Sequence, residues 1–362
     1  ATTEDKDWLA LPEPSEYNEI EGLWNESVAA CESAKVVEIA AEIMSMATEA
    51  EAGLIPGFGG SGVSSYYSAY ANSSGIAHSE KGTVAFASLG AIARIESGVT
   101  PLIFSYDIRR SLDLDLDRAV EDVANTIRVC KRTEKGSSGE HTVVMHPSAY
   151  GQLIYYTLGQ AVRGDNVARG KSKLADKIGE TVAPEVVTIV DDGTAPLGTN
   201  TSIADDEGVP HQRTPIIKKG VLRSFLFDTY WANRTGEKST GNARRNTRRG
   251  LVELAPTNTV VEPGRREIGE IIAGIEHGYL IRNVQGAHSS NPESGDFSVV
   301  GNPAILIQDG EMVGAIHGLM VAGNIYDLFK NAEEVAKTPL VQLGLIGPEI
   351  VFEDVNIITR EG

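Results

Sequence analysis

The sequence predicts an α+β protein, with an N-terminal α/β domain followed by a strand-rich, barrel-like or sandwich C-terminal domain with packed helices. Three observations predict this. A helical apolar repeat is followed by strand-like segments and a second helix. A Gly/Ser-rich linker ends this region at residues 135–139. Beyond it, short apolar runs separated by turn signals alternate with several helical patterns. A chain of 362 residues is long enough for two packed domains.

The first segments of the chain are expected to be an arm and a helix. Residues 1–25 are acidic and contain two prolines, which favours an extended arm. Apolar side chains at helical spacing predict a helix over residues 26–52. Gly57–Gly62 then matches G-x-G-x-x-G, but it follows a helix and precedes a strand-like run. That order is the reverse of a dinucleotide-binding fingerprint, so the segment is interpreted as a flexible connector.

The remainder of the N-terminal domain is expected to be a small sheet with one more helix. Residues 63–71, 84–95 and 102–108 have strand patterns, which predicts an antiparallel meander. Residues 118–131 follow with an apolar helical stripe. The domains are expected to span 26–137 and 138–362, after an arm over 1–25.

Composition narrows the class of protein. The net charge is −18, which repels phosphate backbones and makes nucleic-acid binding unlikely, and only the run Arg244–Arg249 argues the other way. Cys31 and Cys130 lie far apart on apolar helical patterns, which predicts two buried free thiols and a reducing cytoplasm. The sequence has no signal-peptide pattern and no apolar run of membrane-spanning length.

The C-terminal domain is expected to contain alternating short strands and helices. Asp309-Gly310 marks the turn of one hairpin. Residues 285–297 are expected to be a polar loop. The expected helices are 147–162, 174–179, 268–275 and 325–336, and the expected strands are 142–146, 186–190, 258–261, 280–284, 304–307, 312–316, 350–352 and 355–358.

Residues 205–249 form the stretch that is densest in chemistry. An acidic cluster, Asp205-Asp206-Glu207, precedes a hairpin with arms at 215–217 and 221–222, the second arm continuing to Trp231. The stretch ends in the basic residues Arg244–Arg249. Acid on one side of an apolar hairpin and guanidinium on the other could build a polar cleft. The alternative is a solvated hairpin with charged ends.

Four ordered strings resemble one family. They are Asp206-Glu207-Gly208-Val209-Pro210, Ser239-Thr240-Gly241-Asn242-Ala243-Arg244, Asn291-Pro292 through Gly295-Asp296-Phe297-Ser298, and Val321-Ala322-Gly323-Asn324. In this order they look like the TldD/PmbA family, also called TldE or "modulator of DNA gyrase" proteins. The resemblance covers residues 140–358 well and 26–131 more loosely. Members usually carry a further N-terminal segment, so a truncation before residue 1 is expected.

The resemblance implies a soluble metallopeptidase system of two related subunits, which matures or degrades small peptides. The TldD-type subunit carries zinc on an H-E-x-x-x-H helix and a late cysteine, and the PmbA-type subunit lacks them. Counting back from Arg163-Gly164-Asp165 puts Tyr155, Tyr156 and Gln160 at the motif positions. A phenol cannot replace the carboxylate base, and an amide is a poor zinc ligand.

We therefore expect a TldE/PmbA-like subunit with no metal and no cofactor of its own. Zinc is expected in a TldD-like partner, joined as a heterodimer, although a homodimer is also open. A peptide substrate is expected to contact Asp206, Glu207, Arg213, Asn242, Arg244, Asn291 and Asp296.

Two other classes stay open. One is an independent hydrolase, in which Asp191, Asp192 and the cluster Asp205-Asp206-Glu207, near His211, would bind a hard cation. The other is a structural or regulatory binding protein, including a gyrase modulator.

Overall fold

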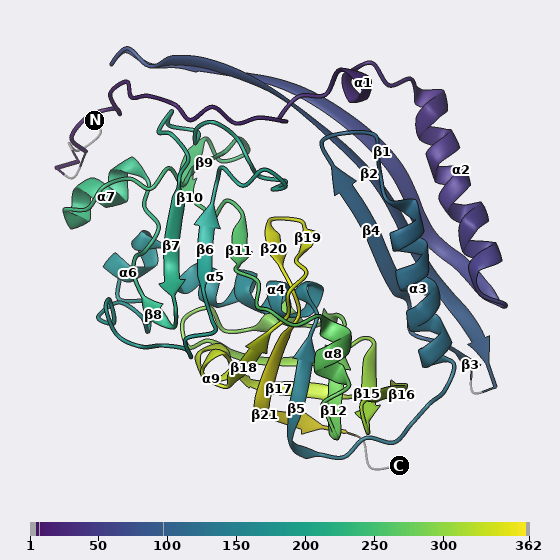
Figure 1. Cartoon of the computed structure of the whole chain (residues 1–362). Coiled ribbons are helices and arrows are strands. Elements are labelled where there is room, and N and C mark those ends of the chain that lie inside the picture. Colours follow the sequence, from purple (N-terminus) through teal and green to yellow (C-terminus); the bar gives the residue numbers. More distant parts are fainter. Residues whose placement is uncertain (1–4, 7, 97, 360–362) are drawn as a thin grey trace.

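The structure is a computed structural model that describes residues 5–6, 8–96 and 98–359. It confirms the α+β class. The N-terminal sheet lies beside a C-terminal part built from two larger sheets (Figure 1). No helix within the described residues is long and apolar enough to cross a membrane.

The N-terminal sheet is an antiparallel meander, as predicted. Its strands are β1 (Leu54–Ala71), β2 (Ala77–Ile95) and β4 (Ile103–Arg109), with β3 (Gly98–Val99) against the end of β2. Helices α2 (Ser33–Ala50) and α3 (Leu116–Cys130) cover one face, where Ala87, Ala91 and Ala93 of β2 are fully buried beneath them. Small side chains let the helices approach the sheet closely.

The expected connector at Gly57–Gly62 is wrong, because these residues lie inside β1, where Phe58–Gly62 pair with β2 and Gly57 lies at a bulge. The pairing partner lies some thirty residues away, so local sequence could not reveal it. The helix expected over 26–52 is split into α1 (Glu26–Ala29) and α2. Cys31 lies between them and is partly exposed, which corrects its expected burial, whereas Cys130 is buried in α3.

A nine-stranded sheet forms the base of the C-terminal part, in the order β13-β14-β17-β21-β5-β12-β15-β16, with β18 on β21. Both of its faces are buried. Val143 and Met145 share a core with Tyr150 and Leu153, and Val144 faces the core that contains α3. Its strands are β5 (Gly139–Met145), β12 (His277–Ile281), β13 (Val284–Gln285), β14 (Asp296–Gly301), β15 (Ala304–Gln308), β16 (Glu311–Ile316), β17 (Met320–Asn324), β18 (Ala332–Val335) and β21 (Ile350–Ile358).

A six-stranded sheet, in the order β19-β20-β11-β6-β7-β8, packs on the other side of the helix that follows β5. Its strands are β6 (Ile189–Asp192), β7 (Arg213–Lys218), β8 (Val221–Leu222), β11 (Thr259–Val261), β19 (Leu340–Gln342) and β20 (Leu345–Gly347). The predicted β7–β8 hairpin turns at Lys219 and Gly220, both with positive φ, as a two-residue hairpin turn requires.

The remaining elements connect and cover these sheets. They are α4 (Pro147–Tyr156), α5 (Leu158–Ala161), α6 (Gly164–Ala168), α7 (Thr229–Thr235), β9 (Ala243–Asn246), β10 (Leu251–Leu254), α8 (Ile268–Ile272), the 3₁₀ turn η1 (Ala287–Ser289) and α9 (Ile325–Lys330). Strands β9 and β10 pair only with each other in the described part of the chain.

Four expected elements differ from the structure. The helix over 147–162 is interrupted at Thr157, whose φ and ψ of −127° and −85° are not helical. Residues 174–179 are turns, and the helix over 325–336 ends at Lys330 because 332–335 pair with β21 as β18. The second hairpin arm ends at Leu222, since Asp228 caps a helix that contains Trp231.

Leu89 is a fully buried residue of β2 that packs in the core with α2 and α3. Replacing it with alanine would leave a cavity in that core. We expect Leu89→Ala to lower the free energy of unfolding by about 2–5 kcal/mol, measured by urea denaturation. The exposed Val37→Ala on α2 is the control and should change it by less than about 0.5 kcal/mol. Equal effects of the two changes would contradict the assigned core.

Candidate functional site

Helix α4 carries Tyr155 and Tyr156, two of the three positions that the sequence predicts to match the zinc motif. His146 caps its start, because the ring Nδ1 accepts a hydrogen bond from Ser148 N at 3.1 Å. At its other end Tyr155 is exposed and Tyr156 is half-buried, with their rings edge to face at 4.9 Å. The phenols lie at the surface end of a helix whose other residues fill the core. The expected placement on this helix therefore holds for Tyr155 and Tyr156.

The third position, Gln160, lies on α5, and its amide groups are engaged by the protein. Arg163 Nη1 donates to Gln160 Oε1 at 3.1 Å, and Gln160 Nε2 donates to the Tyr155 carbonyl at 3.1 Å. Arg163 also forms a two-pronged ion pair with the buried Asp165, at 3.0 and 3.1 Å. The Gln160 oxygen is therefore already an acceptor for Arg163, and an amide is a poor zinc ligand.

Asp205 holds together the acidic stretch that the sequence singles out. The carboxylate is buried and accepts backbone N–H groups from Glu207 and Val209 at 2.9 Å each, and from Ala243 at 3.0 Å. Burial raises the pKa of Asp205 to about 7, against the lowering effect of these donors. One side chain thus joins the loop after residue 204 to strand β9.

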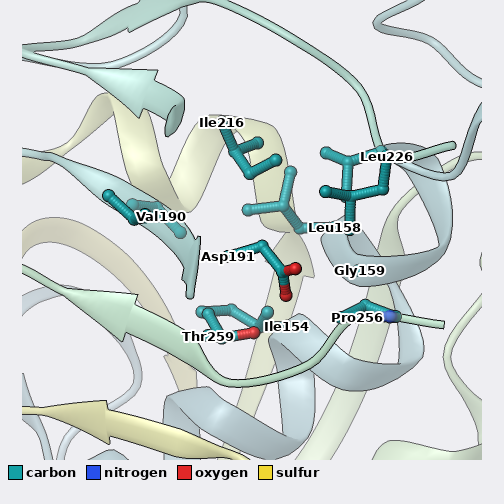
Figure 2. A pocket seen from close by; sticks show the side chains of 11 residues that line it. Ile154, Leu158, Gly159, Val190, Asp191, Ile216, Leu226, Pro256 and Thr259 are labelled. Carbon is teal, nitrogen blue, oxygen red and sulfur yellow. The ribbon is translucent and has the colours of Figure 1, made fainter. Parts of the chain in front are cut away.

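Asp191 makes a second buried network next to it. Its carboxylate accepts hydrogen bonds from Asn242 Nδ2 at 2.7 Å and from the Thr257 N–H and hydroxyl at 2.7 and 3.0 Å. Burial raises the pKa of Asp191 to about 6. A small pocket is lined by this carboxylate and by aliphatic side chains of α4, α5 and β7, among them Leu158 (Figure 2). The pocket is mostly apolar.

The candidate residues around this stretch separate into buried and exposed groups. Glu207 is buried, and its Oε2 accepts the Thr229 N–H at 2.9 Å, while Asn242 is committed to Asp191. Asp206 is exposed and accepts Arg245 N at 2.6 Å, and Arg244 is exposed on the same short hairpin. Arg213 lies on β7, where it pairs with Glu262 and with Asp192 at 3.6 Å.

Asn291, in the loop before β14, and Asp296, the first residue of β14, belong to a separate cluster. Asn291 Oδ1 accepts the N–H groups of Glu293 and Ser294, and Asp296 accepts Ser294 Oγ at 2.6 Å and Asn324 Nδ2 at 2.8 Å. The hydrogen bond from Ser294 is the main cause that lowers the pKa of Asp296. These contacts stay within the loop and the start of α9, so the structure does not join this cluster to Asp205.

The acidic hydrolase site has no support in the geometry. Asp191 and Asp205 accept hydrogen bonds from protein donors on both oxygens, and His211 Nδ1 lies 2.6 Å from the Gly241 carbonyl oxygen. Among the residues that the structure describes, no three His, Cys, Asp or Glu side chains form a group that could hold a metal ion.

Sequence reasoning missed the residues that tie the arm and the sheets to this region. Tyr17 Oη donates to the Gly208 carbonyl at 3.0 Å, and Asn18 Nδ2 donates to the His211 carbonyl at 3.0 Å. Asp228 caps α7, and burial raises its pKa to about 6. Only Asp228 had a local signal, an acid followed by a helical pattern.

The fold defines an α+β class of chain, with two phenols and an amide at the α4–α5 positions that the sequence predicts to match the zinc motif. The family model described as "PmbA/TldA metallopeptidase C-terminal domain" matches residues 138–359. The chain belongs to this PmbA/TldD family.

Relatives agree with that assignment. The crystal structure of TldE from Thermococcus kodakarensis is 36% identical with a TM-score of 0.94, covering 98% of this chain and 81% of that one. An uncharacterized protein of Methanocaldococcus jannaschii is 32% identical over 97% of this chain and 80% of its own length. A metalloprotease TldD homolog of Buchnera aphidicola is 29% identical over 59% of this chain. The chain spans 44% of that homolog's length.

The raised pKa of Asp205 has a defined effect on stability. Its pKa is about 7 in the folded state and about 3.9 in an unfolded chain, so the folded state binds more protons between these values. The contribution of Asp205 is therefore fully present below about pH 4 and is lost as the pH rises through about 7. We expect the stability of the wild-type chain, measured by urea denaturation, to fall between pH 5 and pH 8.

The variant Asp205→Asn tests whether Asp205 causes this fall in stability with pH. It removes one acceptor from a backbone N–H, so we expect a loss of about 1–3 kcal/mol at pH 7 and a shallower pH dependence than in the wild-type chain. Identical slopes in the two proteins would show that another group is responsible.

Proposed function

We propose that this chain is the non-catalytic, TldE/PmbA-like subunit of a metallopeptidase, paired with a zinc-bearing TldD-like homologue that processes small or unfolded peptides. The observation that carries the proposal is the set Tyr155, Tyr156 and Gln160, with Gln160 hydrogen-bonded to Arg163. Zinc in a hydrolase needs neutral imidazole, thiolate or carboxylate ligands and an open position for water. This set offers none of those ligands.

The missing base matters as much as the missing ligands. A metallopeptidase water must lose a proton, and in this family's motif the glutamate takes that role, which a neutral phenol at Tyr156 cannot fill. The segment 337–347, where the catalytic branch is expected to carry a cysteine, has none. Both halves of the water-activating machinery must then come from another chain.

The names of two relatives support the proposed pairing of a non-catalytic chain with a zinc-bearing chain. The Thermococcus kodakarensis structure is named TldE, and the matched bacterial relative is named a metalloprotease TldD homolog. Asp206 and Arg244, exposed at the base of the β9–β10 hairpin, are the candidates for direct contact with peptide. Buried Glu207 and Asn242 would position that hairpin through the contacts described above. The proposed location is the cytoplasm, where Cys31 and Cys130 would stay reduced.

Co-expression with a TldD-type homologue from the same cell tests the proposal. We expect a 1:1 complex on size-exclusion chromatography whose peptidase activity is abolished by a chelator, and no chelator-sensitive cleavage by this chain alone. The variant Gln160→Ala in this chain should leave the activity of the pair within about twofold, because a residue outside the reacting centre contributes little.

Chelator-sensitive cleavage by the purified chain alone would contradict the proposal. The proposal would also be contradicted if the TldD-type homologue did not bind this chain and cleaved peptides at the same rate with and without it.

A further inference from the structure

The loop at residues 205–211 holds several separate segments of the chain together, and we call it the junction loop. The Asp205 carboxylate accepts the N–H of Ala243, the first residue of strand β9, at 3.0 Å. Glu207 Oε2 accepts the N–H of Thr229, the first residue of helix α7, at 2.9 Å. The junction loop therefore fixes both β9 and α7 in place.

The N-terminal arm and the β1–β2 hairpin also contact the junction loop. In the arm, Tyr17 Oη donates to the Gly208 carbonyl oxygen at 3.0 Å. Asn18 Nδ2 donates to the His211 carbonyl oxygen at 3.0 Å. Gly208 has a φ of +82°, and a methyl group on it would lie 2.9 Å from the Tyr70 ring of β1, so the loop backbone packs closely against that strand. Four segments thus depend on the position of one loop.

Three buried carboxylates lie at this junction and have no cation paired with them. Asp205, Glu207 and Asp228 are 5%, 8% and 3% exposed, and none of them forms an ion pair within the part of the chain that the structure describes. They are close to one another because Glu207 N donates to Asp205 Oδ1 at 2.9 Å, while Glu207 and Asp228 both accept N–H groups at the start of α7. Ionising all three without a counter-ion is unfavourable, since burial and mutual repulsion both oppose it.

The basic groups of the neighbouring helices do not neutralise these carboxylates. Arg163, at the start of α6, is committed to Asp165 through hydrogen bonds of 3.0 and 3.1 Å. Arg169, at the other end of α6, pairs with the same carboxylate at 3.0 Å. Burial, the largest effect, raises the pKa of Asp228, and Arg163 lowers it by less. Arg234 lies in the last turn of α7, at the end away from Asp228.

The remaining titratable groups lie on the loop itself, on the arm and on the two nearest strands. Burial is the main cause that lowers the pKa of His211 and raises that of Tyr17, so both side chains are neutral at pH 7. Asp206 and Arg244–Arg245 are exposed. His78 packs on the Tyr17 ring at 5.0 Å, and neither of its buried ring nitrogens has a hydrogen-bond partner among the described residues. Adding a proton to His78 would weaken the junction as the pH falls, so the sign of a pH response separates this effect from that of the carboxylates.

We propose that the junction loop is a pH-dependent switch: as the pH rises, the three carboxylates ionise, and the loop releases α7 and β9 while the two large sheets stay folded. Burial raises the pKa of Asp205 to about 7 and that of Asp228 to about 6, against about 3.9 for an exposed aspartate. The closed form therefore binds more protons than the open form, is favoured at low pH, and is lost as the pH rises through about 6 to 7. The switch is a property of this chain alone and does not rest on the proposed function.

Hydrogen–deuterium exchange of the purified chain at pH 6, 7 and 8 tests the switch, with each rate divided by the intrinsic exchange rate at that pH. Protection of the junction loop, α7 and β9 should fall together, by roughly tenfold between pH 6 and pH 8. Asp205 alone produces about that factor when its pKa falls from about 7 to about 3.9 on opening. Protection of α4 should stay higher at each pH, because its core residues open only on global unfolding. Equal protection of α7 and α4 would overturn the inference.

Two conservative variants test which groups drive the switch. Asp205→Asn cannot ionise, so the protection of α7 should fall by less than about threefold over the same range. Glu207→Gln keeps an acceptor for the Thr229 N–H and removes one negative charge, so its α7 should be better protected at pH 8 than that of the wild-type chain. The control Asp115→Asn makes an acid-to-amide exchange at the N-cap of α3 and should reproduce the wild-type profile. A wild-type slope in Asp205→Asn, or lower protection at pH 8 in Glu207→Gln, would overturn the inference.

Discussion

Burying the Asp205 carboxylate costs free energy, and three backbone N–H groups offset that cost by fixing the loop of Glu207 and Val209 against strand β9. Neighbouring polar contacts of the C-terminal part are built on this fixed loop and on β9. Asn242, next to β9, reaches Asp191, and the arm residue Tyr17 donates to the Gly208 carbonyl of the fixed loop. The densest chemistry in the chain is thus used first to hold the chain together.

The polar side chains of the α4–α5 region are also mostly engaged within the chain. It holds an exposed phenol, a half-buried phenol and an amide bonded to Arg163, none of which is the imidazole, thiolate or carboxylate that zinc prefers. Under the proposed function, the chain would contribute surface to the complex, and its partner would activate the water. Its membership of the PmbA/TldD family and its likeness to a TldE structure place it among relatives that include metalloproteases.

Short sequence patterns correctly predicted the elements whose structure depends on neighbouring residues. The turns at Lys219-Gly220 and Asp309-Gly310, the buried stripe of α3 and the antiparallel meander all follow from short patterns, and the structure has them. The sequence could not predict that Gly57–Gly62 lies in a strand or that 332–335 form β18, because distant strands decide both. For the candidate site, residue identity pointed to the stretch after Asp205, but which members are buried depends on contacts such as that between Asp191 and Asn242.

The central claim is that this chain has no zinc site of its own, and equilibrium zinc binding tests it most directly. The purified chain would be stripped with a chelator, titrated with Zn²⁺ by calorimetry at pH 7.5, and its bound metal measured after dialysis. The account predicts no stoichiometric zinc in the chain alone. One tightly held zinc ion per chain, lost when Tyr155 or Gln160 is replaced by alanine, would contradict it.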